Sequence, residues 1–157
     1  MTKPRLTHTD AEGAVHMVDV GTKPATRRIA VAEARLRASL EAITSLRDMS
    51  AKKGDVLATA RIAAIQAAKR TSDLIPLCHS VALTGVAVDI EVADTTVTLT
   101  VRTETVGPTG VEMEALTAAS VGALTIYDML KALDRRMVIE SVRVLEKQGG
   151  SSGEYKA

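Results

Sequence analysis

The stretch Gly110–Asp134 constrains the fold more than any other part of this chain. Its length predicts one helix of about six to seven turns. Its middle is built from Ala, Ser, Thr and Gly122, so a second backbone can approach it closely. A stripe recurs at helical spacing and predicts the face that packs against the core: Leu116, Ala119, Ala123, Leu124, Tyr127 and Leu130.

Other patterns predict further strands and helices. Period-two alternation favours strands, and apolar residues three or four apart favour helices. In the first third of the chain we expect a short strand His16–Val20, a strand Arg27–Glu33 and a helix carrying Leu36, Leu40, Ile43 and Leu46. A helix Val56–Arg70 capped by Asp55 should follow. We then expect a hairpin of Val81–Val92 and Val97–Val101 that turns at Ala93–Thr96, and a last strand Val138–Leu145.

This order of elements predicts an α+β fold. It matches the ferredoxin-like split βαβ plan, an antiparallel sheet with helices packed on one face. We expect one domain over residues 1–157, with flexible arms at residues 1–15 and 149–157. The other face of the sheet lacks a cover from its own chain, so we expect a homo-oligomer.

Composition narrows the functional classes. The formal net charge is +1, there is no Trp or Phe, and only two Tyr are present, which disfavours a nucleic-acid surface that stacks bases. Cys78 is the single cysteine and has no internal disulfide partner. Because the sequence has neither a run of apolar residues long enough to span a bilayer nor a signal-peptide pattern, we expect no membrane association and a cytoplasmic protein.

The charged residues at the two ends of the long helix have two interpretations each. Asp128 and Lys131 lie on one helix face, either as a surface ion pair worth about 0–1 kcal/mol or as a lysine tuned for proton transfer. Glu112 and Glu114 either complement the helix dipole or bind a ligand. The spacing alone does not decide between these interpretations.

Two further clusters are candidates for ligand binding. Cys78 and His79 are adjacent on a segment that Pro76 keeps out of a helix, but neighbouring residues rarely chelate one ion, so we expect no metal site. Lys53 precedes Gly54 and a helix start, where a phosphate can bind, although the pattern of a P-loop is missing.

Three blocks carry a specific resemblance: KKGDVLATARIAAIQAAKRTSDLIPLCHSVALTGV, TGVEMEALTAASVGALTIYDMLKA and the opening LTH…GAVHMVDVG. They resemble the molybdenum cofactor biosynthesis protein C (MoaC) family, the cyclic pyranopterin monophosphate synthases, from about Leu6 to Lys156. The resemblance implies a ferredoxin-like subunit that forms dimers assembled into a homohexamer, with the active site between subunits.

The resemblance also implies a reaction. A cyclised dihydro-GTP, supplied by an upstream radical enzyme, is rearranged to cyclic pyranopterin monophosphate with loss of pyrophosphate, without a metal or organic cofactor. Such an enzyme is a phosphorus–oxygen lyase. A non-catalytic ligand-binding or assembly module of the same fold is the alternative, and the ionisable residues kept at the motif positions disfavour it.

The resemblance assigns roles residue by residue. Asp128 is the family's catalytic residue, and our hypothesis makes Lys131, held by Asp128, the principal acid/base. The sequence departs from the family at Ser151, where the tail often carries a lysine. The implied substrate-binding residues are Arg28, Lys53, Leu77, Cys78, His79, Glu112, Met113, Glu114 and Lys147.

Overall fold

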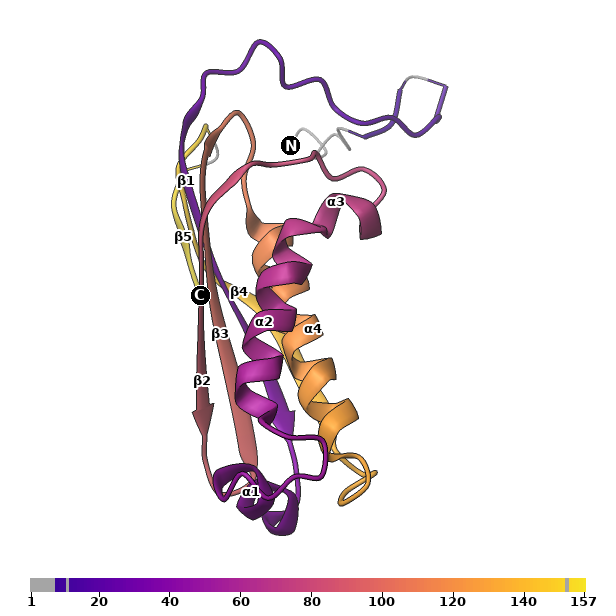
Figure 1. Cartoon of the computed structure of the whole chain (residues 1–157). Coiled ribbons are helices and arrows are strands. Elements are labelled where there is room, and N and C mark those ends of the chain that lie inside the picture. Colours follow the sequence, from indigo (N-terminus) through magenta and orange to yellow (C-terminus); the bar gives the residue numbers. More distant parts are fainter. Residues whose placement is uncertain (1–7, 11, 152) are drawn as a thin grey trace.

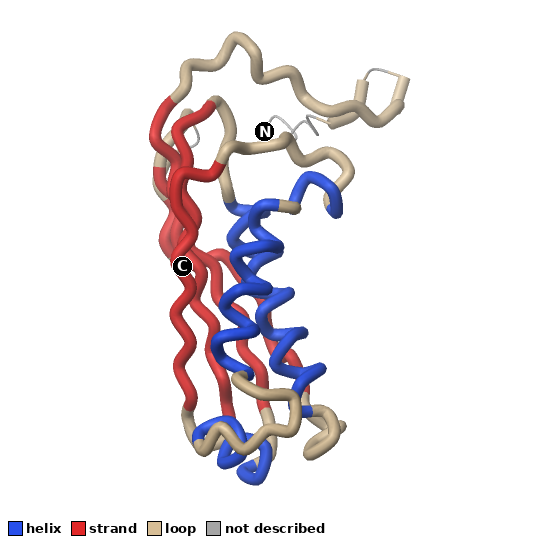
Figure 2. The backbone as a smooth tube through the Cα atoms, in the orientation of Figure 1, coloured by secondary structure: helices blue, strands red, loops and turns tan. Residues whose placement is uncertain are grey.

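A five-stranded sheet with helices on one face forms the architecture of the chain. The fold is that of a computed structural model, which describes residues 8–10, 12–151 and 153–157. Figures 1 and 2 show α2 and α4 side by side on one face of the sheet. The helices are α1 (Leu40–Arg47), α2 (Val56–Lys69), α3 (Thr71–Leu74) and α4 (Glu112–Leu130).

The strand order confirms the predicted α+β fold. The sheet runs β2-β3-β1-β4-β5, with every neighbouring pair antiparallel, as in the split βαβ plan. The strands are β1 (Thr26–Arg37), β2 (Leu83–Val92), β3 (Thr96–Gly107), β4 (Val138–Gln148) and β5 (Tyr155–Lys156).

The core lies between the sheet and the α2–α4 layer. Alternate residues of β1 and β3 point into it and are fully buried: Ala32, Ala34, Leu36, Val97, Leu99 and Val101. Gly122 of α4 lies over them, and a Cβ at this position would be only 2.6 Å from Leu99 Cδ2 and 3.3 Å from Ala64 Cβ of α2. The close approach predicted for the middle of this helix is confirmed.

The predicted phase of α4 is partly wrong. Leu124 is 55% exposed, whereas Ala115, Ala118 and Ile126 are buried. Small side chains define the buried face because α2 approaches so closely, and a larger leucine is accommodated on the outer face. The pattern of large apolar residues was therefore a poor guide to the rotation of the helix.

Two other predicted boundaries need correction. Leu36 belongs to β1, which extends to Arg37 because β3 and β4 pair with it on both sides, so the predicted helix begins later, at Leu40. His16–Val20 forms no strand, and its alternating Val18 and Val20 line a cavity instead.

Local signals for helix starts were more dependable. Asp55 caps α2, accepting a hydrogen bond from Ala58 N at 2.9 Å, as predicted. Ser39 caps α1 in the same way through Ala42 N. Among the described residues, no helix combines the length and apolar character that a bilayer crossing requires.

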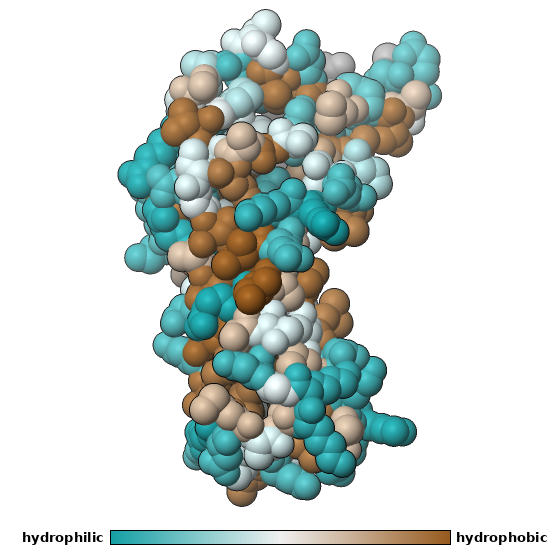
Figure 3. Space-filling model, in the orientation of Figure 1, coloured by the Kyte–Doolittle hydropathy of each residue, from teal (hydrophilic) through white to brown (hydrophobic). Residues whose placement is uncertain are grey.

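The face of the sheet opposite the helices is polar. It carries the ion pairs Arg37–Glu140 at 2.6 Å, Arg143–Glu33 at 3.3 Å and Arg102–Glu104 at 2.8 Å. In the view of Figure 3, brown apolar atoms instead follow the border between β2 and α2. The uncovered sheet face therefore carries charged side chains, which favour contact with water, and is not apolar.

Candidate active site

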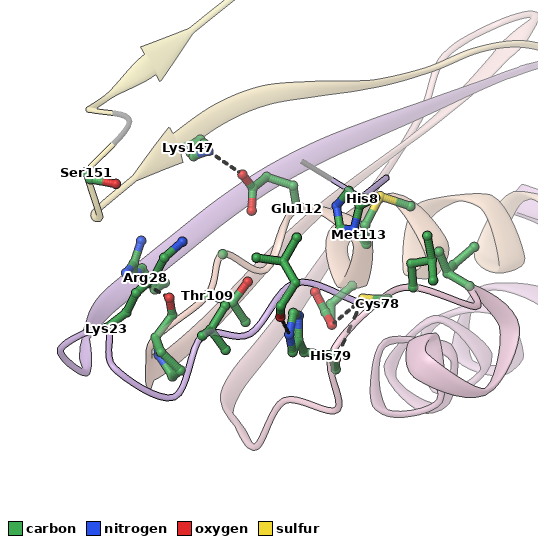
Figure 4. Close-up of a pocket in the computed structure, with 17 residues that line it drawn as sticks. His8, Lys23, Arg28, Cys78, His79, Thr109, Glu112, Met113, Lys147 and Ser151 are labelled. Atoms are coloured by element: carbon green, nitrogen blue, oxygen red, sulfur yellow. Dashed lines mark hydrogen bonds and ion pairs between the residues drawn. The ribbon is translucent and has the colours of Figure 1, made fainter. Parts of the chain in front are cut away.

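A cavity of about 550 Å³ lies at the N-terminal end of α4 (Figure 4). Its walls come from segments far apart in the sequence: the N-terminal segment, β1, the loop after α3, the β3–α4 loop, α4 and the end of β4. The residues that line it are His8, Val18, Val20, Lys23, Arg28, Ile75, Leu77, Cys78, His79, Pro108, Thr109, Gly110, Glu112, Met113, Glu114, Lys147 and Ser151.

The two carboxylates of the first α4 turn have different surroundings. Glu112 forms an ion pair with Lys147 of β4, with Nζ and Oε1 2.6 Å apart. Glu114 is only 3% exposed, and this burial raises its pKa above the ordinary value, with the nearby charge of Glu112 adding to the increase. The cavity therefore holds one ion-paired carboxylate and one that retains its proton more strongly than usual.

Cys78 faces the buried Glu114. Its Sγ donates weakly to Glu114 Oε1 at 3.7 Å. Burial, and then the charge of Glu114, raises the pKa of the thiol to about 11. Because the thiolate is the nucleophilic form, Cys78 contributes a neutral, polarisable wall at physiological pH.

His79 is oriented by the N-terminal segment. Its Nε2 lies 2.7 Å from the backbone oxygen of Val18. A carbonyl only accepts hydrogen bonds, so Nε2 is the donor in this contact and the orientation of the ring is set by it.

Arg28 brings a cation to the opposite wall. It is 9% exposed, and its Nε and Nη2 donate to the backbone oxygens of Gly107 and Pro108, both at 3.3 Å. Figure 4 shows Arg28 between Lys23 and Ser151, with His79 and Cys78 farther along the cavity. One side of the cavity is thus cationic, with Glu112 ion-paired to Lys147, and the other holds the histidine, the thiol and the buried Glu114.

A second cluster lies at the C-terminal end of α4. Asp128 binds two ammonium groups, with Oδ1 2.7 Å from Lys131 Nζ and Oδ2 2.7 Å from Lys53 Nζ. Lys53 also donates to the backbone oxygen of Asp128 at 2.9 Å. Hydrogen bonds from Lys131 and then Lys53 lower the pKa of Asp128 to about 2, so this carboxylate stays ionised.

The structure divides the site residues predicted from the sequence into two groups. Arg28, Leu77–His79, Glu112–Glu114 and Lys147 line the cavity. Lys53, Asp128 and Lys131 form the second cluster. Asp128 follows Glu114 by fourteen residues on one helix, a rise of about 21 Å at 1.5 Å per residue. One chain does not bring the two groups together.

Some lining residues were not among those predicted. Lys23 and His8 reach the cavity from the N-terminal segment, which the sequence presented as an arm and a turn. Lys23 stands five positions before Arg28, and this clustering of cations was the available signal.

The described part of the chain contains no group of three His, Cys, Asp or Glu side chains arranged to hold a metal ion. What the cavity offers is acid/base groups and cations that bind anions.

Comparison with protein families identifies the family of this chain. The model of the MoaC family matches residues 17–150 of the 157-residue chain. The matched range contains both the second cluster and nearly all of the cavity. The chain therefore belongs to the MoaC family, whose members act in the biosynthesis of the molybdenum cofactor.

Proposed function

We propose that this protein is a cyclic pyranopterin monophosphate synthase. It converts (8S)-3',8-cyclo-7,8-dihydroguanosine 5'-triphosphate, supplied by an upstream radical enzyme, to cyclic pyranopterin monophosphate and releases pyrophosphate. The observation that carries the proposal is the cavity, which sets cations opposite a histidine and the buried carboxyl group of Glu114 in a chain of the MoaC family.

The cationic wall suits the triphosphate. Arg28, Lys23 and Lys147 provide positive groups on one side of the cavity. Lysine and arginine bind phosphate oxygens through charge-assisted hydrogen bonds, and they stabilise the charge that develops on departing pyrophosphate. Glu112 forms an ion pair with Lys147, so substrate binding would exchange this ion pair for a phosphate contact.

The opposite wall suits the purine-derived end of the substrate. Leu77, Cys78 and Met113 offer apolar and polarisable contact, while His79 and Glu114 offer hydrogen bonds. A carboxyl group whose pKa is raised can donate a proton to a ring nitrogen or oxygen at a pH where an exposed carboxylate cannot.

The proton transfer that accompanies cyclisation at the phosphate is assigned to the second cluster. Cyclisation forms a new bond from a substrate oxygen to the α-phosphorus while the bond to the pyrophosphate oxygen breaks, and the attacking hydroxyl loses its proton. Asp128 remains ionised and holds two lysines, so it orients them rather than exchanging protons itself. Lys131 acts as the principal acid/base, and Lys53 supplies a further positive charge.

The separation of the two groups motivates an active site shared between subunits. About 21 Å along α4 is too long for one small substrate to contact both clusters of a single chain. We propose that each active site takes the cavity of one subunit and the Lys53–Asp128–Lys131 cluster of another, within dimers assembled into a homohexamer.

The decisive experiment is incubation of the purified protein with the cyclised nucleotide, with detection of pyrophosphate and a pterin product. We expect Asp128→Ala and Lys131→Ala to lower kcat by about 10²- to 10⁴-fold, the usual contribution of a positioned acid/base group. Asp94→Ala and Lys69→Ala remove exposed charges that belong to neither cluster and serve as matched controls.

Circular dichroism and measurement of oligomer size ensure that the variants are folded and assembled. Near-normal turnover by both Asp128→Ala and Lys131→Ala would contradict the assigned roles. Product formation by neither wild type nor controls would contradict the proposed reaction and favour a non-catalytic module.

A further inference from the structure

The turn that follows β4 passes directly over the side chain of Arg28. Gly150 lies on this turn with φ at +84°. A Cβ at Gly150 would overlap Arg28 Nη1 and would lie 2.7 Å from Arg28 Cζ and 3.3 Å from Nη2. An ordinary carbon contact needs 3.4–4 Å, so the guanidinium occupies the space that any side chain at position 150 would take.

The guanidinium is also held from its other side. Nε and Nη2 donate to the backbone oxygens of Gly107, the last residue of β3, and of Pro108, the first residue of the β3–α4 loop. Arg28 is consequently enclosed between this loop and the turn at Gly150, with 9% of its surface exposed. Two main-chain segments, more than forty residues apart in sequence, fix the plane of one side chain.

The neighbouring glycine plays a different part. A Cβ at Gly149 would overlap the backbone oxygen of Arg27 and would lie 3.2 Å from Arg28 Cδ, so a side chain there disturbs the main chain of β1 first. The atoms that a Cβ at Gly150 would meet all belong to the Arg28 guanidinium. A substitution at position 150 therefore meets the guanidinium first, whereas one at position 149 meets the main chain of β1 first.

We propose that Gly150 is a positioning residue for phosphate recognition by Arg28. Its bare α-carbon lets the turn close over the guanidinium, which is then fixed in the cavity wall before a phosphate arrives. A preorganised guanidinium loses little freedom on binding and keeps the planar geometry that phosphate oxygens require. The inference rests on the proposed function in one respect, the contact between Arg28 and a substrate phosphate.

The test compares Gly150→Ala with Gly153→Ala. Both substitutions place a methyl group on a residue with left-handed backbone, with φ at +84° and +75°. A Cβ at Gly153 meets nothing within 4 Å, so this variant carries the backbone strain without the contact to Arg28. The ligand is inorganic pyrophosphate, titrated calorimetrically into the assembled protein, and steady-state kinetics with the cyclised nucleotide accompany it.

We expect Gly150→Ala to weaken pyrophosphate binding and to lower kcat/KM by about tenfold or more, because a misplaced guanidinium loses its contact with the phosphate both in the bound substrate and as pyrophosphate departs. Gly153→Ala should bind pyrophosphate as the wild type does. In an Arg28→Ala background, Gly150→Ala should weaken binding no further, because the two changes act through one group.

Stability provides a second readout that remains usable if Gly150→Ala folds poorly. Removing the Arg28 side chain makes room for the methyl group, so Gly150→Ala should lower Tm less in the Arg28→Ala background than in the wild type. An equal loss in both backgrounds, or identical pyrophosphate binding by Gly150→Ala and Gly153→Ala, would overturn the positioning role.

The outcomes separate this inference from the proposed function. A wild-type protein that makes no product, yet binds pyrophosphate in a way that depends on Arg28 and Gly150, refutes the proposed reaction and supports the positioning role. A wild-type protein that makes product while Gly150→Ala matches Gly153→Ala supports the reaction and refutes the positioning role.

Discussion

The raised pKa of Glu114 makes the stability of the fold depend on pH, and a substitution at this position can test that dependence. Burial raises its pKa, so the folded chain keeps this proton at pH values where the unfolded chain, with an ordinary pKa of 4.5, has lost it. The folded state then binds more protons, and the free energy of unfolding falls as the pH rises from about 4.5 through the folded pKa. Below that window, this contribution to stability is fully present.

We predict that Glu114→Gln removes this dependence. The variant should have a higher Tm than the wild type at pH 7, by roughly 2–4 °C for each 1 kcal/mol gained in a chain of this length. The two proteins should converge below pH 4. Activity should nevertheless fall by at least about tenfold. Gln cannot supply the proton that Glu114 is proposed to donate, and substitutions that stabilise a functional site often lower its activity.

Thermal unfolding at several pH values checks this prediction. Glu91→Gln, which replaces an exposed carboxylate of β2, is the matched control. A Tm difference between wild type and Glu114→Gln that does not change with pH would contradict the assignment.

Single residues were predicted from sequence with uneven success. Resemblance implied catalytic or substrate-binding roles for Glu112, Glu114, Asp128 and Lys131, and the surroundings of these side chains depend on the fold. The sequence paired Asp128 only with Lys131, three positions away. Lys53 joins the same carboxylate across 75 positions, and such a contact exists only once α2 and α4 are packed together.

The α2–α4 layer depends on small side chains. Gly122 lies against Leu99 and Ala64, so little room remains at this crossing. We predict that Gly122→Val lowers the free energy of unfolding by about 1–3 kcal/mol, the usual cost of overpacking a core. The measurement is chemical denaturation of the purified protein.

Gly85→Val is the matched control for this substitution. Gly85 lies in β2, where an added Cβ would be 4.0 Å from Glu104 Cβ and a β-branched residue suits a strand. Its effect should stay within about 0.5 kcal/mol. If Gly122→Val lowered the free energy of unfolding no more than Gly85→Val, the crossing at Gly122 would tolerate a larger side chain.

The boundaries of helices and strands show which features local sequence patterns can predict. The caps at Ser39 and Asp55 act through neighbouring residues, so local sequence suffices for the starts of α1 and α2. The length of β1 was underestimated because its many alanines have weak strand preference, and pairing with β3 and β4 compensates for it. Caps depend on residues close in sequence and were predictable, whereas the length of β1 depends on pairing with segments far away in sequence and was not.

At the scale of the whole molecule, the surfaces differ from the expectation. The sequence predicted an oligomer because one sheet face lacks a cover. That face is charged and ion-paired, whereas Ile62 of α2 and Leu124 of α4 are 59% and 55% exposed on the helices. The proposal of an oligomer now rests on the distance between the two functional clusters.

Complementation between subunits tests that proposal. Glu114→Gln disables the cavity, and Asp128→Ala disables the second cluster. If each active site combines one cluster from each of two chains, co-assembly of equal amounts of the two variants restores about one quarter of the wild-type activity, since about one quarter of the sites receive both intact clusters.

Each variant assembled alone is the control and should remain nearly inactive. Product formation is measured after co-expression, with the subunit ratio determined by mass spectrometry. A mixture that is no more active than its two components would place a complete active site within each chain.

The short strand β5 has a practical consequence for work with this protein. Tyr155–Lys156 pairs with Glu146–Lys147, and Ala157 N donates to the backbone oxygen of Leu145 at 2.8 Å. A purification tag fused after Ala157 would therefore begin at the outer edge of the sheet, beside the strand that carries Lys147 into the cavity. Tag-free protein is the proper reference for every binding and kinetic measurement on this cavity.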